Sequence, residues 1–475
     1  MSNLTILHRS RNAGCLFVDY ADTDRIAVID LSQDTGPREF SYAELNAGCD
    51  AVANRLCDLG FDRGDRIAIM SGNRVEYYTA FFGSMRAGCV PLQINMKLGP
   101  DTLHEVIAQA DAKFVFHDAA SKAKVPAGIP RVCFDDAVWS EFQRSSTFVA
   151  FSPGPDDMAF QPYTSGTTGL PKGILLRHSN VIRTYRMIAP ETARLDPLMR
   201  SILAQPIYHK NGMIGSKIVF LNGGTVILQN GFKVDDYLNA AERYSCTNLK
   251  TVPTMMAMIV ARQDLLAVFD LKSVRMIGMS SAPVSERLFD DVVAAFPGAR
   301  VRNNYGCTEA GAVLFGDHPH GMPVPKLSIG YPISDTEVKL VGGPSDDEGV
   351  LHARNPGVMA GFHRMPAESA ARLTDGWINT GDVLRRDKEG FYYFVGRADD
   401  MFVCGGMNLY PATVERTMLR HPDVQQCVVI AVEDQIKGMV PWAFVVLRRN
   451  VIRSENELKS FALEAAPAYQ HPRRV

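Results

Sequence analysis

The sequence has 475 residues, of which 46% are hydrophobic and 21% are charged, and its formal net charge is −2. A chain of this length exceeds what one hydrophobic core normally organises, so we expect at least two domains. The nearly neutral charge excludes bulk attraction to nucleic acid, and no apolar run is long enough for a transmembrane segment. The first residues lack the apolar core of a signal peptide, so a cytoplasmic location is expected.

The nine cysteines indicate neither a disulfide framework nor a zinc site. They form no CxxC pair, and no histidine lies at metal-ligand spacing from them. We therefore expect small buried thiols in a reducing compartment.

The first half of the chain alternates strand-like and helix-like segments. Short apolar runs predict strands, and apolar residues at helical spacing predict helices between them. Such alternation is typical of parallel sheets covered on both faces. The predicted strands are residues 66–70, 87–93, 113–116, 225–228 and 274–279, and the predicted helices are 75–85, 102–110, 234–244 and 284–296.

The pattern changes near residue 329, where short strands separated by Gly, Pro and Asp turns indicate a β-rich subdomain of about residues 329–397. A compact α+β unit then follows a strand at 391–395. We therefore predict two domains, residues 1–397 and 398–475. The expected elements of the second are helices 412–419 and 455–465 and strands 424–432 and 442–447.

The loop from Tyr163 to Gly173 (YTSGTTGLPKG) has the composition of a polyphosphate cradle. Its glycines, serine and threonines leave backbone amides and hydroxyls free to face an anion, and Lys172 adds a positive charge. Pro171 stands where a Walker A loop needs its second glycine, so the loop is not a P-loop. A flexible polar linker is the alternative, although Tyr163 and Pro171 favour a shaped loop.

This loop resembles the signature of the superfamily of adenylating enzymes that contains acyl-CoA synthetases, non-ribosomal peptide adenylation domains and firefly luciferase. Four further segments match in the same order, and the resemblance covers nearly the whole chain. They are FSYAEL at 40–45, NYGCTE at 304–309, WINTGD at 377–382 and the hinge region 396–411. The resemblance implies an α/β fold: a large N-terminal domain of stacked parallel-sheet subdomains with a small β-barrel-like subdomain, then a small, mobile α+β domain.

The resemblance also implies the roles of individual residues in binding ATP and Mg²⁺. Tyr305 offers a flat ring for adenine, Asp382 can accept both ribose hydroxyls, and Glu309 with Thr168 supplies the oxygen ligands that magnesium prefers. Lys172, Glu309, His209 and Thr164 are the expected catalytic residues. The expected nucleotide-binding residues are Thr164, Ser165, Gly166, Thr167, Thr168, Gly169, Lys172, Ser281, Ala282, Pro283, Asn304, Tyr305, Gly306, Thr308, Asp382 and Arg397.

The same resemblance assigns a hinge, a CoA site and an acyl pocket. Asp399 matches the hinge; Gly405 and Gly406 match glycines that let the CoA arm pass, and Arg86 and Arg473 are expected to contact CoA. Lys210 could contact a polar or anionic substrate tail, but we expect a surface lysine. The expected acyl pocket is of medium width and consists of His209, Met213, Ile214, Val252, Met255, Ser280, Cys307 and Gly311. The same residue types are equally typical of an ordinary hydrophobic core.

The chain departs from the family pattern at its end. Members carry a later Thr-Gly-Lys motif whose lysine assists adenylation, whereas this sequence ends at Val475, in residues that resemble the preceding segment. We therefore expect residues 398–475 to be a truncated domain and the chain to adenylate poorly without that lysine.

We expect a carboxylic acid:CoA ligase that uses ATP, Mg²⁺ and CoA, forms an acyl-AMP, and acts on an aromatic or fatty acid; a homodimer is compatible with this. A stand-alone adenylation enzyme that loads an acyl carrier protein is the first alternative. A non-catalytic nucleotide sensor is the second, and the retained loop, Glu309, Asp382 and Arg397 argue against it. A luciferase-like oxygenase shares the fold, but no sequence feature selects it.

Overall fold

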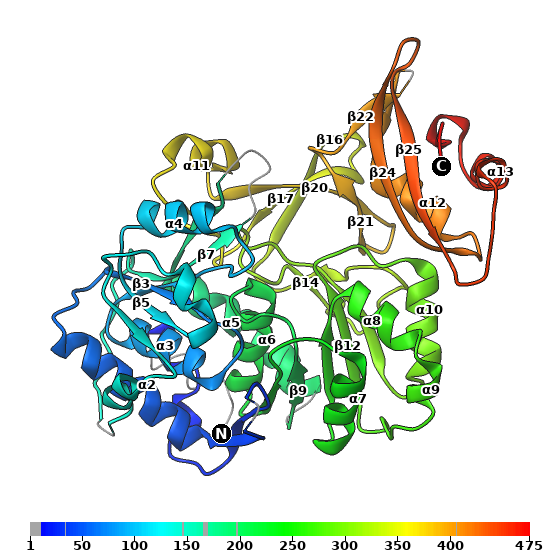
Figure 1. The fold of residues 1–475 in the computed structure, drawn as a ribbon. Coiled ribbons are helices and arrows are strands. Elements are labelled where there is room, and N and C mark those ends of the chain that lie inside the picture. Colours follow the sequence, from blue (N-terminus) through cyan, green and yellow to red (C-terminus); the bar gives the residue numbers. More distant parts are fainter. Residues whose placement is uncertain (1–10, 34, 145–146, 165–169, 196–197, 405) are drawn as a thin grey trace.

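The computed structural model describes residues 11–475 except 34, 145–146, 165–169, 196–197 and 405. Figure 1 shows two parallel-stranded sheets side by side in the lower part of the molecule, with the C-terminal residues above them. Among the described residues, no helix combines the length and the apolar character needed to cross a membrane.

The first large sheet has the strand order β18-β8-β7-β4-β3-β5-β6. Strands β4, β3, β5 and β6 pair in parallel and β7 joins β4 in parallel, whereas β8 and β18 are antiparallel additions. Its strands are β3 (Arg66–Met70), β4 (Val90–Gln93), β5 (Ala112–His117), β6 (Arg131–Cys133), β7 (Met158–Thr164), β8 (Lys172–Arg177) and β18 (Gly361–Phe362). The helices of this part are α2 (Tyr42–Asp58), α3 (Val75–Arg86), α4 (Pro100–Gln109) and α5 (His178–Leu195).

The second large sheet has the order β13-β12-β11-β9-β10-β1-β2, and all its pairs are parallel except β1 with β2. Its strands are β1 (Ile26–Asp30), β2 (Arg38–Ser41), β9 (Arg200–Leu203), β10 (Thr225–Leu228), β11 (Asn248–Thr251), β12 (Met276–Ser280) and β13 (Arg300–Asn304). Its helices are α6 (Lys210–Leu221), α7 (Val234–Arg243), α8 (Pro253–Val260), α9 (Gln263–Leu266) and α10 (Glu286–Ala295). Helices α5 and α6 lie between the two sheets (Figure 1).

The β-rich segment forms a five-stranded antiparallel sheet, and the remaining strands form a four-stranded antiparallel sheet near the C-terminus. The five-stranded sheet contains β16 (Glu337–Ser345), β17 (Glu348–Arg354), β19 (Leu373–Thr374), β20 (Trp377–Arg386) and β21 (Tyr392–Arg397), with α11 (Pro366–Arg372) beside it. Strands β14 (Phe315–Gly316) and β15 (Tyr331–Pro332) pair separately. The C-terminal elements are β22 (Phe402–Cys404), β23 (Met407–Leu409), β24 (Val424–Asp434), β25 (Gly438–Leu447), α12 (Pro411–Leu419) and α13 (Glu455–Ala465).

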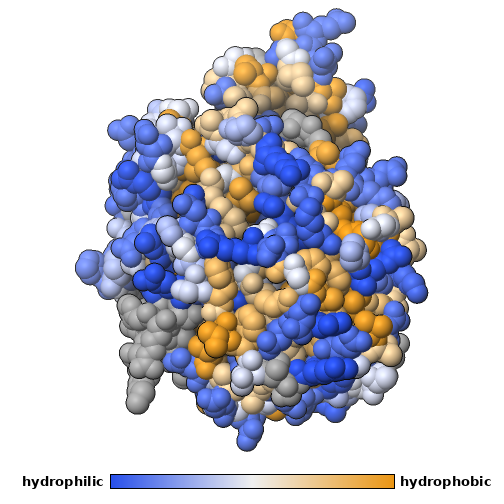
Figure 2. Space-filling view, turned by 90° about the vertical axis from the view of Figure 1, so that its left-hand side faces the viewer, coloured by the Kyte–Doolittle hydropathy of each residue, from blue (hydrophilic) through white to orange (hydrophobic). Residues whose placement is uncertain are grey.

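The hydrophobic core is divided. The largest cluster joins the first sheet, α5 and α6, a second cluster lies under α7, α8 and α10, and a third is built from residues 402–475 alone. On the face shown in Figure 2, hydrophobic residues lie among many hydrophilic ones. The fold therefore matches the predicted α/β class with a smaller α+β part at the C-terminus.

One predicted strand is shorter than expected. The run 87–93 predicts a single strand, but helix α3 extends to Arg86 and the strand begins only at Val90. Gly88 lies between them with a φ of 88° and reverses the chain direction, a conformation that glycine adopts without steric cost.

Helix α2 begins with a complete capping box. The Ser41 side chain accepts a hydrogen bond from the Glu44 amide, and the Glu44 carboxylate accepts one from the Ser41 amide at 2.7 Å. We expect Ser41→Ala to lower the free energy of unfolding by about 1 kcal/mol, measured as a shift of the first denaturant transition.

The control for this prediction is Ser140→Ala, which removes an exposed hydroxyl that donates to the Ala137 carbonyl. That change should stay within about 0.5 kcal/mol. Equal shifts for the two variants would show that the cap does not stabilise α2.

Candidate active site

The glycine-rich loop connects two antiparallel strands. Thr164 at the end of β7 lies opposite Lys172 at the start of β8, and Tyr163 lies opposite Gly173. The ends of the loop are therefore held side by side, with the Lys172 ammonium 5.6 Å from the centre of the Phe362 ring. The predicted phosphate-binding residues 165–169 lie outside the described residues.

The carboxyl ends of β12 and β13 bring the next predicted residues together. Ser280 lies opposite Asn304 in the parallel pair, so the segments that follow, Ser281 and Tyr305, begin at the same edge of the sheet. Ser281 has a φ of 71°, which non-glycine residues rarely adopt and which is found at ligand sites more often than elsewhere. Ala282 and Pro283 follow it on the exposed surface.

Gly306 lies at a point of very close backbone approach. A Cβ atom at this position would stand 1.7 Å from the Ala312 carbonyl oxygen, so only glycine fits without moving the backbone. This contact folds residues 306–312 into a tight loop beside Tyr305.

A hydrogen-bonded chain links Tyr305, Asp382 and Arg397. The Tyr305 hydroxyl donates to one carboxylate oxygen of Asp382 at 2.5 Å, and Arg397 Nη1 donates to the other at 2.8 Å. Burial and the nearby Asp382 charge raise the pKa of Tyr305 well above its usual value, so the phenol stays protonated. Each carboxylate oxygen keeps a further lone pair that could accept a ribose hydroxyl.

Thr308 and Glu309 follow Tyr305 in the same loop. Glu309 Oε2 accepts a hydrogen bond from the Cys307 thiol at 3.2 Å, and its backbone carbonyl accepts one from the Met359 amide at 2.8 Å. A carboxylate and a hydroxyl that are both partly exposed fit a magnesium ion that keeps several waters.

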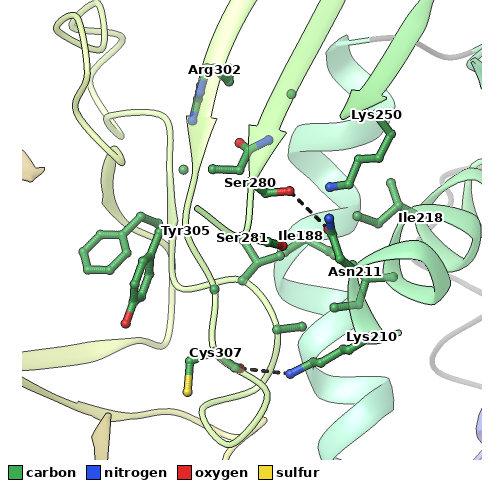
Figure 3. A pocket seen from close by; sticks show the side chains of 18 of the residues that line it. Ile188, Lys210, Asn211, Ile218, Lys250, Ser280, Ser281, Arg302, Tyr305 and Cys307 are labelled. Carbon is green, nitrogen blue, oxygen red and sulfur yellow. Dashed lines mark hydrogen bonds between the residues drawn. The ribbon is translucent and has the colours of Figure 1, made fainter. Parts of the chain in front are cut away.

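A cavity of about 260 Å³ begins at this loop and runs between the second sheet and helix α6 (Figure 3). It brings together eight of the predicted nucleotide and acyl residues: Ile214, Ser280, Ser281, Asn304, Tyr305, Gly306, Cys307 and Thr308. Its walls are more apolar than polar, and Met199, Ile218, Met276 and Phe315 are among the apolar residues that line it.

Five predicted acyl-pocket residues do not line this cavity. Met213 and Met255 are buried in two different core clusters, and Val252 is the N-cap residue of α8. Gly311 packs against Gly357, where an added Cβ would stand 2.8 Å from a backbone carbon. His209 is the N-cap residue of α6 with its ring 4.7 Å from that of Tyr208, and burial lowers its pKa.

Arg86, which was predicted to contact CoA, is buried inside the fold. Its side chain is only 2% exposed and forms an ion pair with Asp50 at 2.6 Å. Arg86 Nε also donates to the Gly14 carbonyl at 2.9 Å, and the guanidinium lies over the Phe17 ring. Nearly every residue of α3 is buried, so the arginine at its end is buried with them and holds the fold together.

The predicted hinge and the remaining CoA residues lie at the C-terminal part. Asp399 contacts Arg397 at 3.2 Å and Arg372 at 3.9 Å. Gly406 is exposed in the turn between β22 and β23 at a φ of 85°, and Gly405 lies outside the described residues. Arg473 Nη1 contacts His471 Nδ1 at 3.2 Å, and its amide donates to the Pro441 carbonyl.

The sequence prediction missed several polar residues of the cavity. Lys210 was expected at the surface, but its ammonium is buried and donates to the Cys307 carbonyl at 2.9 Å, and burial lowers its pKa to about 8. Asn211, Lys250 and Arg302 also line the cavity. In the sequence, Lys250 and Arg302 alternate with other residues along strands, and Lys210 and Asn211 stand at the start of a helix. Both patterns are equally typical of residues that face solvent.

Comparison with known proteins gives consistent matches along the chain. A family model described as AMP-binding enzyme matches residues 19–363, and one described as AMP-binding enzyme C-terminal domain matches residues 413–475. A feruloyl-CoA synthase from an Amycolatopsis species is 33% identical over 457 residues, which cover 93% of this chain and 90% of that protein.

Two solved structures have closely similar folds. ATP-bound MatB from Rhodopseudomonas palustris superposes with a TM-score of 0.87 at 26% identity, covering 100% of this chain and 95% of that one. The o-succinylbenzoate CoA synthetase from Bacillus subtilis, in complex with its acyl-adenylate intermediate, gives 0.84 at 26% identity and covers 97% and 94% of the two chains.

Proposed function

This chain belongs to the AMP-binding enzyme family, and we propose that it is an AMP-forming acid:CoA ligase in which one continuous cavity holds the acyl group beside the nucleotide. The observation that carries this proposal is the position of the Tyr305–Asp382–Arg397 chain. Tyr305 links this chain to the cavity, because its ring lines the cavity while its hydroxyl donates to Asp382. An acid bound there would present its carboxylate to the α-phosphate of ATP.

In the first half-reaction we propose that a carboxylate oxygen of the acid attacks the α-phosphorus, while the bond to pyrophosphate breaks. Lys172 and the hydroxyl-rich loop that starts at Thr164 hold the β- and γ-phosphates, and Tyr305, Asp382 and Arg397 position adenine and ribose. Glu309, with Thr168 or Thr308, would hold Mg²⁺, which neutralises phosphate charge when bound. Positioning and charge neutralisation supply most of the rate enhancement in such reactions.

In the second half-reaction we propose that residues 398–475 reorient about Asp399. The thiol of CoA, after losing its proton, then attacks the acyl carbon, and AMP leaves with the electron pair of the broken acyl–phosphate bond. Gly405 and Gly406 would let the CoA arm approach the backbone closely, since a glycine leaves that path open. His209, at the start of α6, would gate the entrance to the acyl pocket, and Arg473 would contact CoA.

The test is acid-dependent release of pyrophosphate from Mg·ATP, screened over benzoates, cinnamates, dicarboxylates and fatty acids of graded length. We expect release with one class of acid, and acyl transfer to free CoA. Lys172→Met should abolish the release, whereas the exposed control Lys272→Met should not. Transfer to a holo carrier protein but not to CoA would instead assign a stand-alone adenylation enzyme, and no release with any acid would contradict ligase activity.

A further inference from the structure

The walls of the acyl cavity come from alternate residues of three neighbouring strands. Asn248 and Lys250 on β11, Met276, Gly278 and Ser280 on β12, and Arg302 and Asn304 on β13 face the same side of the sheet. Helix α6 covers this side with Asn211, Ile214 and Ile218. The cavity therefore extends from the nucleotide end, at the carboxyl ends of the strands, down along the sheet.

The Lys250 side chain packs against Gly215 of helix α6, which covers the cavity. A Cβ atom added to Gly215 would lie 3.5 and 3.8 Å from the Cγ and Cδ atoms of Lys250. The aliphatic stem of the lysine thus runs beneath α6, where a larger residue at 215 would crowd it. Figure 3 shows its ammonium directed toward Asn211, on the side of the cavity opposite Tyr305.

The ammonium of Lys250 has no acceptor among the described residues, which distinguishes it from the other cations around the cavity. Lys210 donates to the Cys307 carbonyl at 2.9 Å, and Arg302 forms an ion pair with Asp317. Within the same described part of the chain, Asn211 Nδ2 also lacks an acceptor, while its Oδ1 accepts from Ser280. Asn211 Nδ2 is a buried donor, and buried donors are normally paired, so it leaves room for an acceptor supplied by a ligand beside the Lys250 ammonium.

The electrostatic environment favours an anion at this point. Lys210 on α6 and Lys250 on β11 both line the cavity. Burial lowers the pKa of Lys250 to about 8 because no carboxylate compensates its charge. Glu309 lies near Lys210 at the nucleotide end, so the deeper part keeps an excess of positive charge.

We propose that the acid activated by this enzyme carries a second anionic group, a carboxylate or sulfonate, at the end opposite the reacting carboxyl group, and that Lys250 binds it. The apolar residues that line the cavity contact the body of the acid: Ile188, Met199, Ile214, Ile218, Met276 and Phe315. This inference rests on the ligase function proposed above. It narrows the substrate from aromatic or fatty acids in general to compact acids with two charged ends.

The test compares matched acids that differ only at the far end. Terephthalate is paired with 4-methylbenzoate, 4-carboxycinnamate with 4-methylcinnamate, and adipate with hexanoate, and kcat/KM is measured by pyrophosphate release. We expect the enzyme to favour the charged member of at least one pair by about tenfold or more, the range expected when a buried charge is paired. A sulfonate analogue of the preferred acid then distinguishes the two anions.

Lys250→Met should remove that preference, lowering kcat/KM for the charged acid by about thirtyfold while leaving the uncharged acid unchanged or improved. Turnover of the uncharged acid also reports that the variant is folded. Lys250→Arg should keep the preference, and Lys272→Met, at a lysine whose side chain is 92% exposed, should behave like the parent enzyme.

Two results would overturn the inference while leaving the ligase function intact. One is preference of the parent enzyme for the uncharged member of every pair. The other is an equal decrease of kcat/KM for the charged and the uncharged acid in Lys250→Met. Absence of pyrophosphate release with all acids would instead reject the ligase function itself.

Discussion

Asp382→Asn is expected to lower kcat/KM for ATP in acid-dependent pyrophosphate release by about a hundredfold. The carboxylate accepts hydrogen bonds from the Tyr305 hydroxyl at 2.5 Å and from Arg397 at 2.8 Å. An amide keeps the size but presents one acceptor and one donor, and its donor faces either a phenol or a guanidinium. One of the two acceptor oxygens that could bind the ribose hydroxyls is therefore lost.

The same sheet offers a matched control. Asp387 accepts a hydrogen bond from the Tyr393 hydroxyl at 2.9 Å, so it forms a tyrosine–aspartate pair of the same kind outside the cavity. Asp387→Asn should leave the kinetics unchanged within about twofold. If Asp382→Asn had no larger effect than Asp387→Asn, the proposed ribose site would be wrong.

Asp50→Asn is expected to destabilise the protein by about 3 to 5 kcal/mol, the usual loss when one partner of a buried ion pair is neutralised. Asp50 is the carboxylate that compensates Arg86, and their side chains are 12% and 2% exposed. The remaining partners of Arg86, the carbonyls of Gly14 and Asn46, are neutral. The loss should appear in the first transition of a denaturant titration.

The matched control is the exposed pair of Lys113 and Asp111, whose atoms lie 3.0 Å apart with both side chains about half exposed. Asp111→Asn should change stability by less than about 1 kcal/mol. The KM for CoA should be unaltered in folded Asp50→Asn. A raised KM for CoA without loss of stability would restore Arg86 as a CoA ligand.

Periodicity predicted part of the fold, in some elements with the observed bounds. Strands β3 and β10 and helix α13 have the bounds that the apolar pattern predicts, because each is flanked by turn residues that end the pattern. The strand predicted at 87–93 was too long because Ala87 to Cys89 are apolar and at least partly buried for another reason. They form the turn that follows a fully packed helix.

Contiguous motifs and distant residues differ in how well the sequence indicates their position in the fold. Tyr305, Thr308 and Ser281 lie where short contiguous motifs place them, since a loop at a strand end keeps its residues together. The acyl cavity is built from distant strands and one helix, and no local pattern shows which strand face the helix covers. In β11, Asn248 and Lys250 alternate with Leu249 and Thr251, a pattern that predicts a strand with one face in solvent. In the structure, helix α6 covers the face that carries Asn248 and Lys250.

The third hydrophobic cluster has a consequence for motion between the two parts of the chain. Among the described residues, this cluster begins at Phe402. Contacts across the junction include polar ones such as that of Arg287 with the Pro422 carbonyl at 2.7 Å. Asp399 joins the junction to Arg372 and Arg397 through ion pairs whose side chains are between 34% and 49% exposed. Dissolved ions weaken such pairs but leave buried apolar contacts nearly unaffected. We therefore expect the orientation of residues 402–475 relative to the rest of the chain to depend on ionic strength more than their internal packing does.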